Sequence, residues 1–233
     1  MAPTLVTSCT ALDVPKRSRG FTLIELLVAL AVMAVMAGLS WRGIDGMVRA
    51  QAQVQARSDA VLTLQAGLSQ WGADLDALLE IPTTTALDWD GRALRVTRRN
   101  TAEPGKGALV VAWTRRNIDG TGQWLRWQSA PLLTRGEWQT AWAQAAQWAQ
   151  NPGDEERKLE VRITPLEQWS VFYYRNDSWS NPLSSDGSPI VPGGTPVVLP
   201  DGIRLVLTLP AEGAISGTLT RDWMRPTQGG NKS

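Results

Sequence analysis

The sequence is dominated by one apolar run, residues 21–39, in which Thr22 and Glu25 are the only polar side chains and no proline occurs. A helix of this length rises about 30 Å, which matches the hydrocarbon thickness of a bilayer. A buried helix of a soluble protein is the alternative, but such a helix is rarely apolar on every face for so long. We therefore expect one transmembrane helix at residues 21–41.

Charged side chains flank this run asymmetrically. Lys16, Arg17 and Arg19 immediately precede it, whereas the charges that follow it are mixed in sign. The positive-inside rule keeps such a cationic flank in the cytoplasm. The sequence therefore predicts a single-pass membrane protein, with a cytoplasmic N-terminus and with the C-terminal domain on the opposite side of the membrane.

The junction at residues 16–25, KRSRGFTLIE, combines basic residues, a glycine, a phenylalanine and an intramembrane glutamate. It resembles the leader of type IV pilins and of the pseudopilins of type II secretion. The resemblance implies that a prepilin peptidase cuts between Gly20 and Phe21 and methylates the new amine of Phe21. Residues 1–20 would then be a leader peptide, and residues 21–233 the mature chain.

Glu25 is the unusual polar residue of the run, because a carboxylate inside hydrocarbon costs at least about 2–3 kcal/mol. Cleavage before Phe21 would free an amine about one helical turn away. The family resemblance implies that Glu25 pairs with this amine on a neighbouring subunit of a filament. The alternative is a glutamate that reaches the headgroups and has no specific partner.

A stem helix is expected to continue the span over residues 42–81. No proline occurs between Phe21 and Ile81, and Pro82 ends the pattern. Apolar residues recur at helical spacing. They are Val61, Leu64, Leu68, Trp71, Leu75 and Leu78. A cofactor groove and a coiled-coil seam are alternatives, but we expect this stripe to pack against the globular domain of the same chain.

Beyond the stem, apolar and polar residues tend to alternate with a period of two, which is typical of strands. Strands are expected at residues 93–98, 108–114, 123–128, 159–164, 169–174, 203–209 and 215–220. Turns are expected at 119–122 and 176–177, a helix at 137–150, a long loop at 181–200 and a polar tail at 224–233. The fold class is therefore α+β, in which a long N-terminal transmembrane and stem helix packs against an antiparallel β domain at 82–223.

Composition limits the chemistry of the chain. The 233 residues contain 23 Lys and Arg, 22 Asp and Glu, one cysteine and no histidine. A balanced charge argues against a nucleic-acid partner, and the missing histidine removes the common catalytic triads and zinc sites. We expect no enzyme activity, no cofactor and no metal.

Tryptophan is unusually frequent, with twelve residues against two Phe and two Tyr. Trp124, Trp127 and Trp138 are the best candidates for a sugar or nucleic-acid surface, but packing in the core or an interface explains them more simply. The carboxylates of Asp74 and Asp76 are expected to be solvated. The arginine pairs at 98–99 and 115–116 are expected at exposed strand ends.

Two later segments, residues 166–179 and 199–209, resemble strands of minor pseudopilin J of type II secretion systems. This resemblance implies a subunit that helps to initiate the pseudopilus tip. Its implied partners are the prepilin peptidase, I-like and K-like minor pseudopilins and the inner-membrane assembly platform. A minor pilin of a type IV pilus or competence system is the near alternative, and a membrane-anchored periplasmic binding module is the more distant one.

Overall fold

The computed structural model describes residues 20–184 and 199–226. Most of the expected leader, loop and tail, at 1–20, 181–200 and 224–233, therefore lies outside the described residues. The chain divides into two compact units, residues 1–53 and 54–233. Each unit is described by itself.

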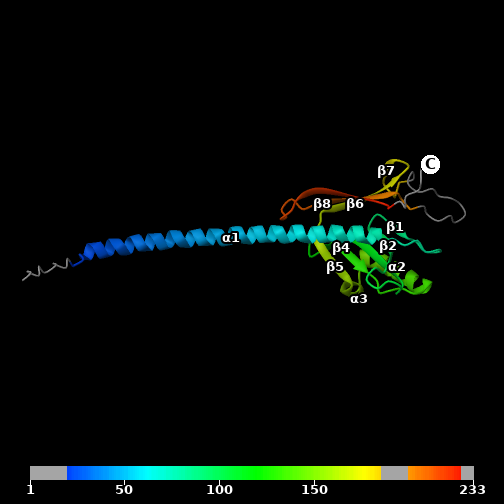
Figure 1. The fold of residues 1–233 in the computed structure, drawn as a ribbon, viewed down its shortest axis with the longest axis horizontal. Helices are drawn as coiled ribbons and strands as arrows, with labels where there is room; N and C mark the ends of the chain where they lie inside the picture. Colours follow the sequence, from blue (N-terminus) through cyan, green and yellow to red (C-terminus); the bar gives the residue numbers. More distant parts are fainter. Residues whose placement is uncertain (1–19, 185–198, 227–233) are drawn as a thin grey trace, which may run out of the picture. The chain divides into compact units, whose positions relative to one another are not determined.

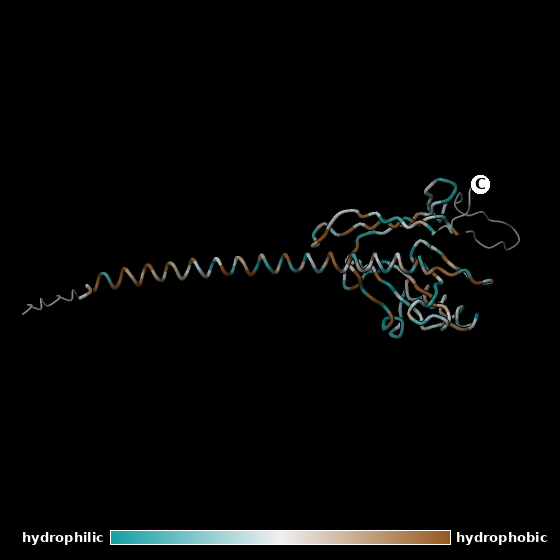
Figure 2. Tube along the Cα trace, in the orientation of Figure 1, coloured by the Kyte–Doolittle hydropathy of each residue, from teal (hydrophilic) through white to brown (hydrophobic). Residues whose placement is uncertain are grey.

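The first unit contains the N-terminal part of helix α1 (Leu23–Asp76). Every described side chain up to Gln53 is exposed, and the apolar colouring is concentrated in the first turns of the helix (Figure 2). Among the described residues, this helix alone is long and apolar enough to cross a membrane. The helix contains several glycines but no proline, so no residue within it blocks the backbone hydrogen bonds of the helix.

The second unit contains the end of α1 and two antiparallel sheets (Figure 1). The five-stranded sheet has the strand order β1-β2-β3-β4-β5, and the four-stranded sheet has the order β7-β6-β8-β9. The first sheet comprises β1 (Leu87–Trp89), β2 (Ala93–Arg99), β3 (Ala108–Ile118), β4 (Thr121–Gln128) and β5 (Glu160–Pro165). The second comprises β6 (Gln168–Arg175), β7 (Ser178–Ser180), β8 (Gly202–Leu209) and β9 (Gly217–Met224). Two helices, α2 (Arg135–Gln150) and α3 (Asp154–Lys158), lie between β4 and β5 in the chain.

The five-stranded sheet separates two hydrophobic cores. In the first core, side chains of α1 such as Trp71 pack with Trp113 of β3 and with Leu205 of the four-stranded sheet. In the second core, Val110 of β3 packs with Trp148 of α2. The alternation of side chains along a strand explains how neighbouring residues of β3 reach different cores.

Two tight turns have the geometry that the sequence predicts. Asp119 and Gly120 join β3 to β4 with φ values of 51° and 81°. Asn176 and Asp177 join β6 to β7 with φ values of 50° and 60°. Two successive positive φ values characterise the hairpin turns that favour Asn, Asp and Gly. The turn predicted at 176–177 is therefore confirmed, and the one predicted at 119–122 is confirmed for 119–120, since Thr121 and Gly122 belong to β4.

The α+β class, with a long apolar N-terminal helix followed by antiparallel sheets, is confirmed. The helix itself ends at Asp76, five residues before the predicted end of the stem at 81. The backbone leaves the helix to pair with β2, because Leu79 N donates to Thr97 O at 2.9 Å and Arg99 N donates to Ala77 O at 2.8 Å.

Other boundaries also differ from the predictions. The strands β1 and β7 and the helix α3 have three, three and five residues, and pieces this short give no readable periodicity. The final strand covers Gly217–Met224 rather than 215–220, because it pairs with the full length of β8, from Leu209↔Gly217 to Gly202↔Met224.

Candidate functional site

The residues of the expected processing site precede α1. Gly20 and Phe21 are both exposed, and Phe21 is 88% exposed. The helix then begins with a reciprocal cap. Thr22 N and Thr22 Oγ1 donate to Glu25 Oε2 at 2.9 and 2.8 Å, and Glu25 N donates to Thr22 Oγ1 at 3.3 Å. This is the capping-box arrangement of a threonine followed three residues later by a glutamate.

The capping box gives the Glu25 carboxylate a hydrogen-bonding partner within its own chain. Its signal, Thr-x-x-Glu before an apolar run, is readable in the sequence, but neither the expected pairing of Glu25 with an amine nor the headgroup alternative includes this cap. Two hydrogen bonds reduce the cost of placing the carboxylate in an apolar environment. These bonds come from an amide N–H and a hydroxyl group, so they supply no positive charge.

The six apolar residues of the expected stem stripe have different environments. Leu64, Trp71 and Leu75 are buried in the first core, and Leu68 and Leu78 pack against it while partly exposed. Leu78 does so from beyond the end of α1, where it forms a bridge with Arg98.

The first stripe position, Val61, is half-buried and lies outside this core. Val61 and Leu62 instead line a shallow hollow on α1 together with Val54. The contact of α1 with the first core therefore begins at Leu64.

Gly67 is a buried position of α1 that sequence reasoning missed. A Cβ atom at this position would lie 2.4 Å from Ile163 Cγ2 and 3.2 Å from Trp124 Cζ3. The absence of a side chain thus lets α1 approach β4 and β5 closely. The spacing could have indicated this role, because Gly67 follows Leu64 by three residues and precedes Trp71 by four.

Replacing Gly67 by alanine is expected to destabilise the second unit, whereas replacing Gly72 by alanine is expected to stabilise it. Alanine is favoured over glycine by about 1 kcal/mol in either helix position. At Gly67 overpacking costs about 1–3 kcal/mol, while nothing lies within 4 Å of a Cβ at Gly72. Chemical unfolding of the full chain in detergent, followed by tryptophan fluorescence, measures the difference. Equal stabilities of the two variants would contradict the close approach of α1.

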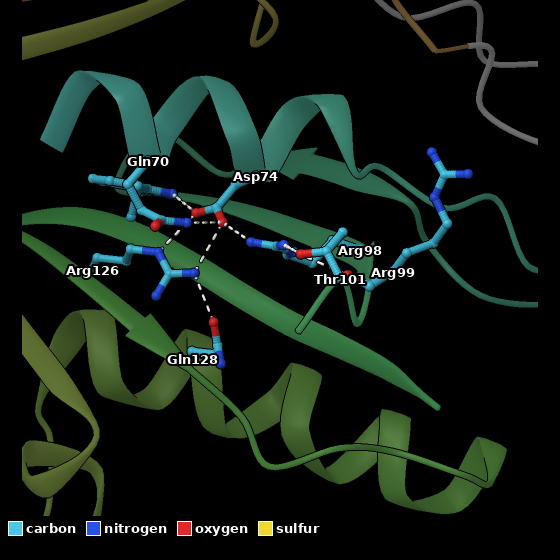
Figure 3. Close-up of polar contacts among 8 residues, drawn as sticks. Gln70, Asp74, Arg98, Arg99, Thr101, Arg126 and Gln128 are labelled. Carbon is cyan, nitrogen blue, oxygen red and sulfur yellow. Dashed lines mark hydrogen bonds and ion pairs between the residues drawn. The ribbon is translucent and has the colours of Figure 1, made fainter. Parts of the chain in front are cut away.

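A polar cluster around Asp74 joins the end of α1 to the five-stranded sheet (Figure 3). Asp74 is fully buried. Arg126 of β4 donates to both of its oxygens, from Nε to Oδ2 at 2.8 Å and from Nη2 to Oδ1 at 2.9 Å. Trp113 Nε1 donates to Oδ2 at 2.9 Å, Gln70 Nε2 donates to Oδ1 at 2.9 Å, and Arg98 Nη1 also pairs with Oδ1. We call these five residues the Asp74 cluster.

The Asp74 cluster corrects the expectation that Asp74 is solvated and that Arg98 lies at an exposed strand end. The two guanidinium groups are themselves held by further acceptors, with Arg98 Nη2 donating to Thr101 Oγ1 and Arg126 Nη2 to Gln128 Oε1, both at 2.7 Å. The donors thus occupy the carboxylate from several sides. This arrangement suits a structural anchor, because Asp74 has no oxygen directed toward solvent for proton transfer or metal binding.

A second polar contact fastens α2 to the sheet. Trp148 Nε1 and Arg116 Nη2 both donate to Glu160 Oε2, at 2.9 and 2.6 Å. Arg115 Nε donates to the Leu166 carbonyl at 2.9 Å. The arginine pair at 115–116 is therefore partly buried and bonded, rather than exposed as expected. Trp138 likewise donates its Nε1 to Thr97 Oγ1 at 2.9 Å.

The tryptophans singled out from the sequence belong to the cores. Trp124 and Trp127 are fully buried and Trp138 is 8% exposed. Trp124 packs beside Trp113, with ring centroids 4.7 Å apart. The expectation that these three residues serve packing is confirmed, and they form no exposed platform for a ligand.

Several groups of the second unit have shifted pKa values. Burial, with the nearby Asp88 carboxylate as a smaller cause, raises the pKa of Tyr173 far above its usual value. Hydrogen bonds from Arg204 lower the pKa of Asp222. Backbone N–H groups at the start of α2 lower the pKa of Glu137. Each shift moves the pKa further from 7, so these groups do not change protonation near pH 7.

Comparison with known proteins identifies the N-terminal segment. Residues 15–41 match the family described as the prokaryotic N-terminal methylation motif. No curated protein matches the chain. One similar solved structure belongs to the GspK–GspI–GspJ complex of the type 2 secretion system of enterotoxigenic Escherichia coli, with 17% identity, a TM-score of 0.43, and coverage of 72% of this chain and 99% of that one. Phe21, the capping box of Thr22 and Glu25, and the apolar first turns of α1 thus lie within the segment that matches this N-terminal methylation motif.

Proposed function

We propose that the chain is a minor pseudopilin, a membrane-stored subunit that joins the tip of a type II secretion pseudopilus and helps to initiate its assembly. The methylation motif at residues 15–41 carries this proposal. The peptidase would cut between Gly20 and Phe21, and methylation would follow on Phe21. Segment 21–41 would span the inner membrane and place the remaining residues in the periplasm.

An assembly role fits the exposed apolar surface of α1 and the burial of the candidate tryptophans. The first turns of α1 expose apolar side chains, which can be covered by lipid before assembly and by neighbouring helices afterwards. Proteins with a pilin-type leader are structural components rather than enzymes. The binding-module alternative loses its best candidates, because Trp124, Trp127 and Trp138 are all buried.

The assignment to the J-like branch rests on the resemblance of residues 166–179 and 199–209. Its partners would be I-like and K-like minor pseudopilins, the prepilin peptidase and the inner-membrane assembly platform. Residues 42–81 would serve as the stem, including the short segment that follows the end of α1. Residues 82–223 would form the globular periplasmic domain. Residues 64–75 of the stem would hold this domain through the first core.

Deletion of the gene, followed by complementation, tests the function. We expect export of type II substrates to fail in the deletion strain and to return with the full chain, while twitching and DNA uptake are unchanged. Co-purification from crosslinked membranes should recover other minor pseudopilins. Normal export with defective pili would identify the chain as a minor pilin instead.

Processing gives a separate prediction. The intact mass of the protein extracted from membranes should correspond to residues 21–233 with one added methyl group. The variant Gly20→Val should retain residues 1–20, because a branched side chain at the cleaved bond obstructs the peptidase. The variant Gly38→Val, within the helix and away from the bond, is the matched control and should be processed normally. A mature terminus other than Phe21 would contradict the assignment.

A further inference from the structure

Trp41 differs from the other eleven tryptophans of the chain in its surroundings. Those eleven belong to the second unit, where each is buried or half-buried. Trp41 lies on α1 in the first unit and is 74% exposed. No hydrogen bond joins its indole N–H to another described residue. The fold of the chain therefore accounts neither for this apolar ring nor for its polar N–H group.

The position of Trp41 matches the length of the apolar segment. From Leu23, where α1 begins, to Trp41 the helix rises about 27 Å at about 1.5 Å per residue. The hydrocarbon core of a bilayer is about 30 Å thick. When the first turn of α1 lies at one surface of this core, Trp41 therefore lies at the other surface.

The polarity of the helix changes at Trp41. Residues 26–40 contain no charged side chain. Arg42 follows Trp41 directly, and Asp45, one turn further on, pairs with Arg49 at 2.6 Å. Trp41 thus marks the boundary between the apolar part of α1 and its charged continuation.

Tryptophan combines a large apolar ring with one N–H donor, so neither water nor hydrocarbon satisfies the whole side chain. Water leaves the apolar surface of the ring exposed, and hydrocarbon leaves the N–H without an acceptor. The surface region of a bilayer covers the ring with acyl chains and offers oxygen acceptors to the N–H. Tryptophan is accordingly enriched at both membrane–water interfaces. The exposure of Trp41 and its place at the end of the apolar segment favour this environment.

We propose that Trp41 is an interfacial anchor, which binds phospholipid at the surface where α1 leaves the bilayer. Its ring packs against the headgroup ends of the acyl chains, and its Nε1 donates a hydrogen bond to a phosphate or ester oxygen. The bound indole fixes the depth of the helix, because a shift in either direction loses one of these two contacts. The inference rests on the proposed span at 21–41, but it requires neither cleavage before Phe21 nor a role in secretion.

Depth-dependent fluorescence quenching tests the proposal. The full chain and its Trp41→Phe variant are reconstituted in phosphatidylcholine vesicles whose acyl chains carry bromine either near the headgroup or near the bilayer centre. The eleven shared tryptophans cancel in the difference between the two proteins. We expect bromine near the headgroup to quench the Trp41 signal at least about twofold more than bromine near the centre. Equal quenching by the two lipids, stronger quenching from the centre, or no quenching overturns the proposal.

Two further variants separate the anchor from the span itself. Each combines Trp41→Phe with a new tryptophan about 9 Å away along the helix, Val35→Trp within the apolar segment or Met47→Trp beyond it. Both positions are exposed on α1. Bromine near the centre should quench Val35→Trp at least about twofold more than bromine near the headgroup, and either lipid should quench Met47→Trp at least about threefold less than Trp41.

The outcomes distinguish failure of the anchor from failure of the span. If Val35→Trp responds as expected and Trp41 is not quenched, the anchor is wrong and the span at 21–41 stands. If neither Val35→Trp nor Trp41 is quenched, the span is wrong as well. Quenching of Met47→Trp as strong as that of Trp41 would show that α1 leaves the bilayer at a later residue, which also overturns the anchor.

Discussion

Replacing Asp74 by alanine is expected to lower the free energy of unfolding of the second unit by about 3–5 kcal/mol. The substitution leaves Arg98 and Arg126 buried without their shared counter-charge. It also leaves the indole N–H of Trp113 without an acceptor. Alanine favours the helix by about 0.7 kcal/mol at most, which is too little to offset these losses.

Unfolding by urea, monitored by tryptophan fluorescence on the full chain in detergent, measures this effect. Asp59→Ala is the matched control, because Asp59 is an exposed residue of the same helix whose carboxylate accepts one hydrogen bond, from Gln55 Nε2 at 2.9 Å. Its stability should change by no more than about 0.5 kcal/mol. A loss below about 1 kcal/mol in Asp74→Ala would show that the cluster does not anchor the helix.

Replacing Glu25 by glutamine is expected to reduce pseudopilus assembly and export more than tenfold. A glutamine amide can still accept from Thr22 and preserve the capping box, but it cannot neutralise the amine of a neighbouring subunit. An unpaired charge in the hydrocarbon costs about 2–3 kcal/mol even on lenient scales. The substitution therefore separates the charge of Glu25 from its role in the cap.

Thr22→Val provides the opposite control, because it removes the capping hydroxyl and keeps the carboxylate. It should cost only about 0.5–2 kcal/mol of local helix stability and leave most export intact. Sheared-filament yield and the exported fraction of a secreted enzyme give two independent measurements. If Glu25→Gln gives wild-type filament yield and a wild-type exported fraction, the proposed pairing of Glu25 with an amine is wrong.

Much of the fold follows from local patterns in the sequence. The apolar run at 21–39 predicts the N-terminal part of α1, and the alternation of polar and apolar residues locates most of the strands. The Asp, Asn and Gly residues at 119–122 and 176–177 predict two turns, because these residue types adopt positive φ values at low cost. These signals depend on residues that are close in the chain, so they can be read without knowing the tertiary structure.

The Asp74 cluster could not be predicted in the same way. Its members are separated by 24 residues between Asp74 and Arg98 and by 52 between Asp74 and Arg126, so no local pattern connects them. A weaker signal did exist, since Asp74 follows Trp71 by three residues and Gly67 by seven, which places it on the buried face of the helix. A carboxylate on such a face needs a cationic partner.

The strand β3 supplies side chains alternately to two cores, with Val111 and Trp113 in the first and Val110 and Ala112 in the second. Deleting a single residue upstream within this strand would exchange the two sets. Tryptophan would then be forced into the space of alanine under α2, and alanine would leave a void beside α1. A deletion within this central strand is therefore expected to disrupt both cores at once, whereas a change of length in a surface loop leaves the register of β3 intact.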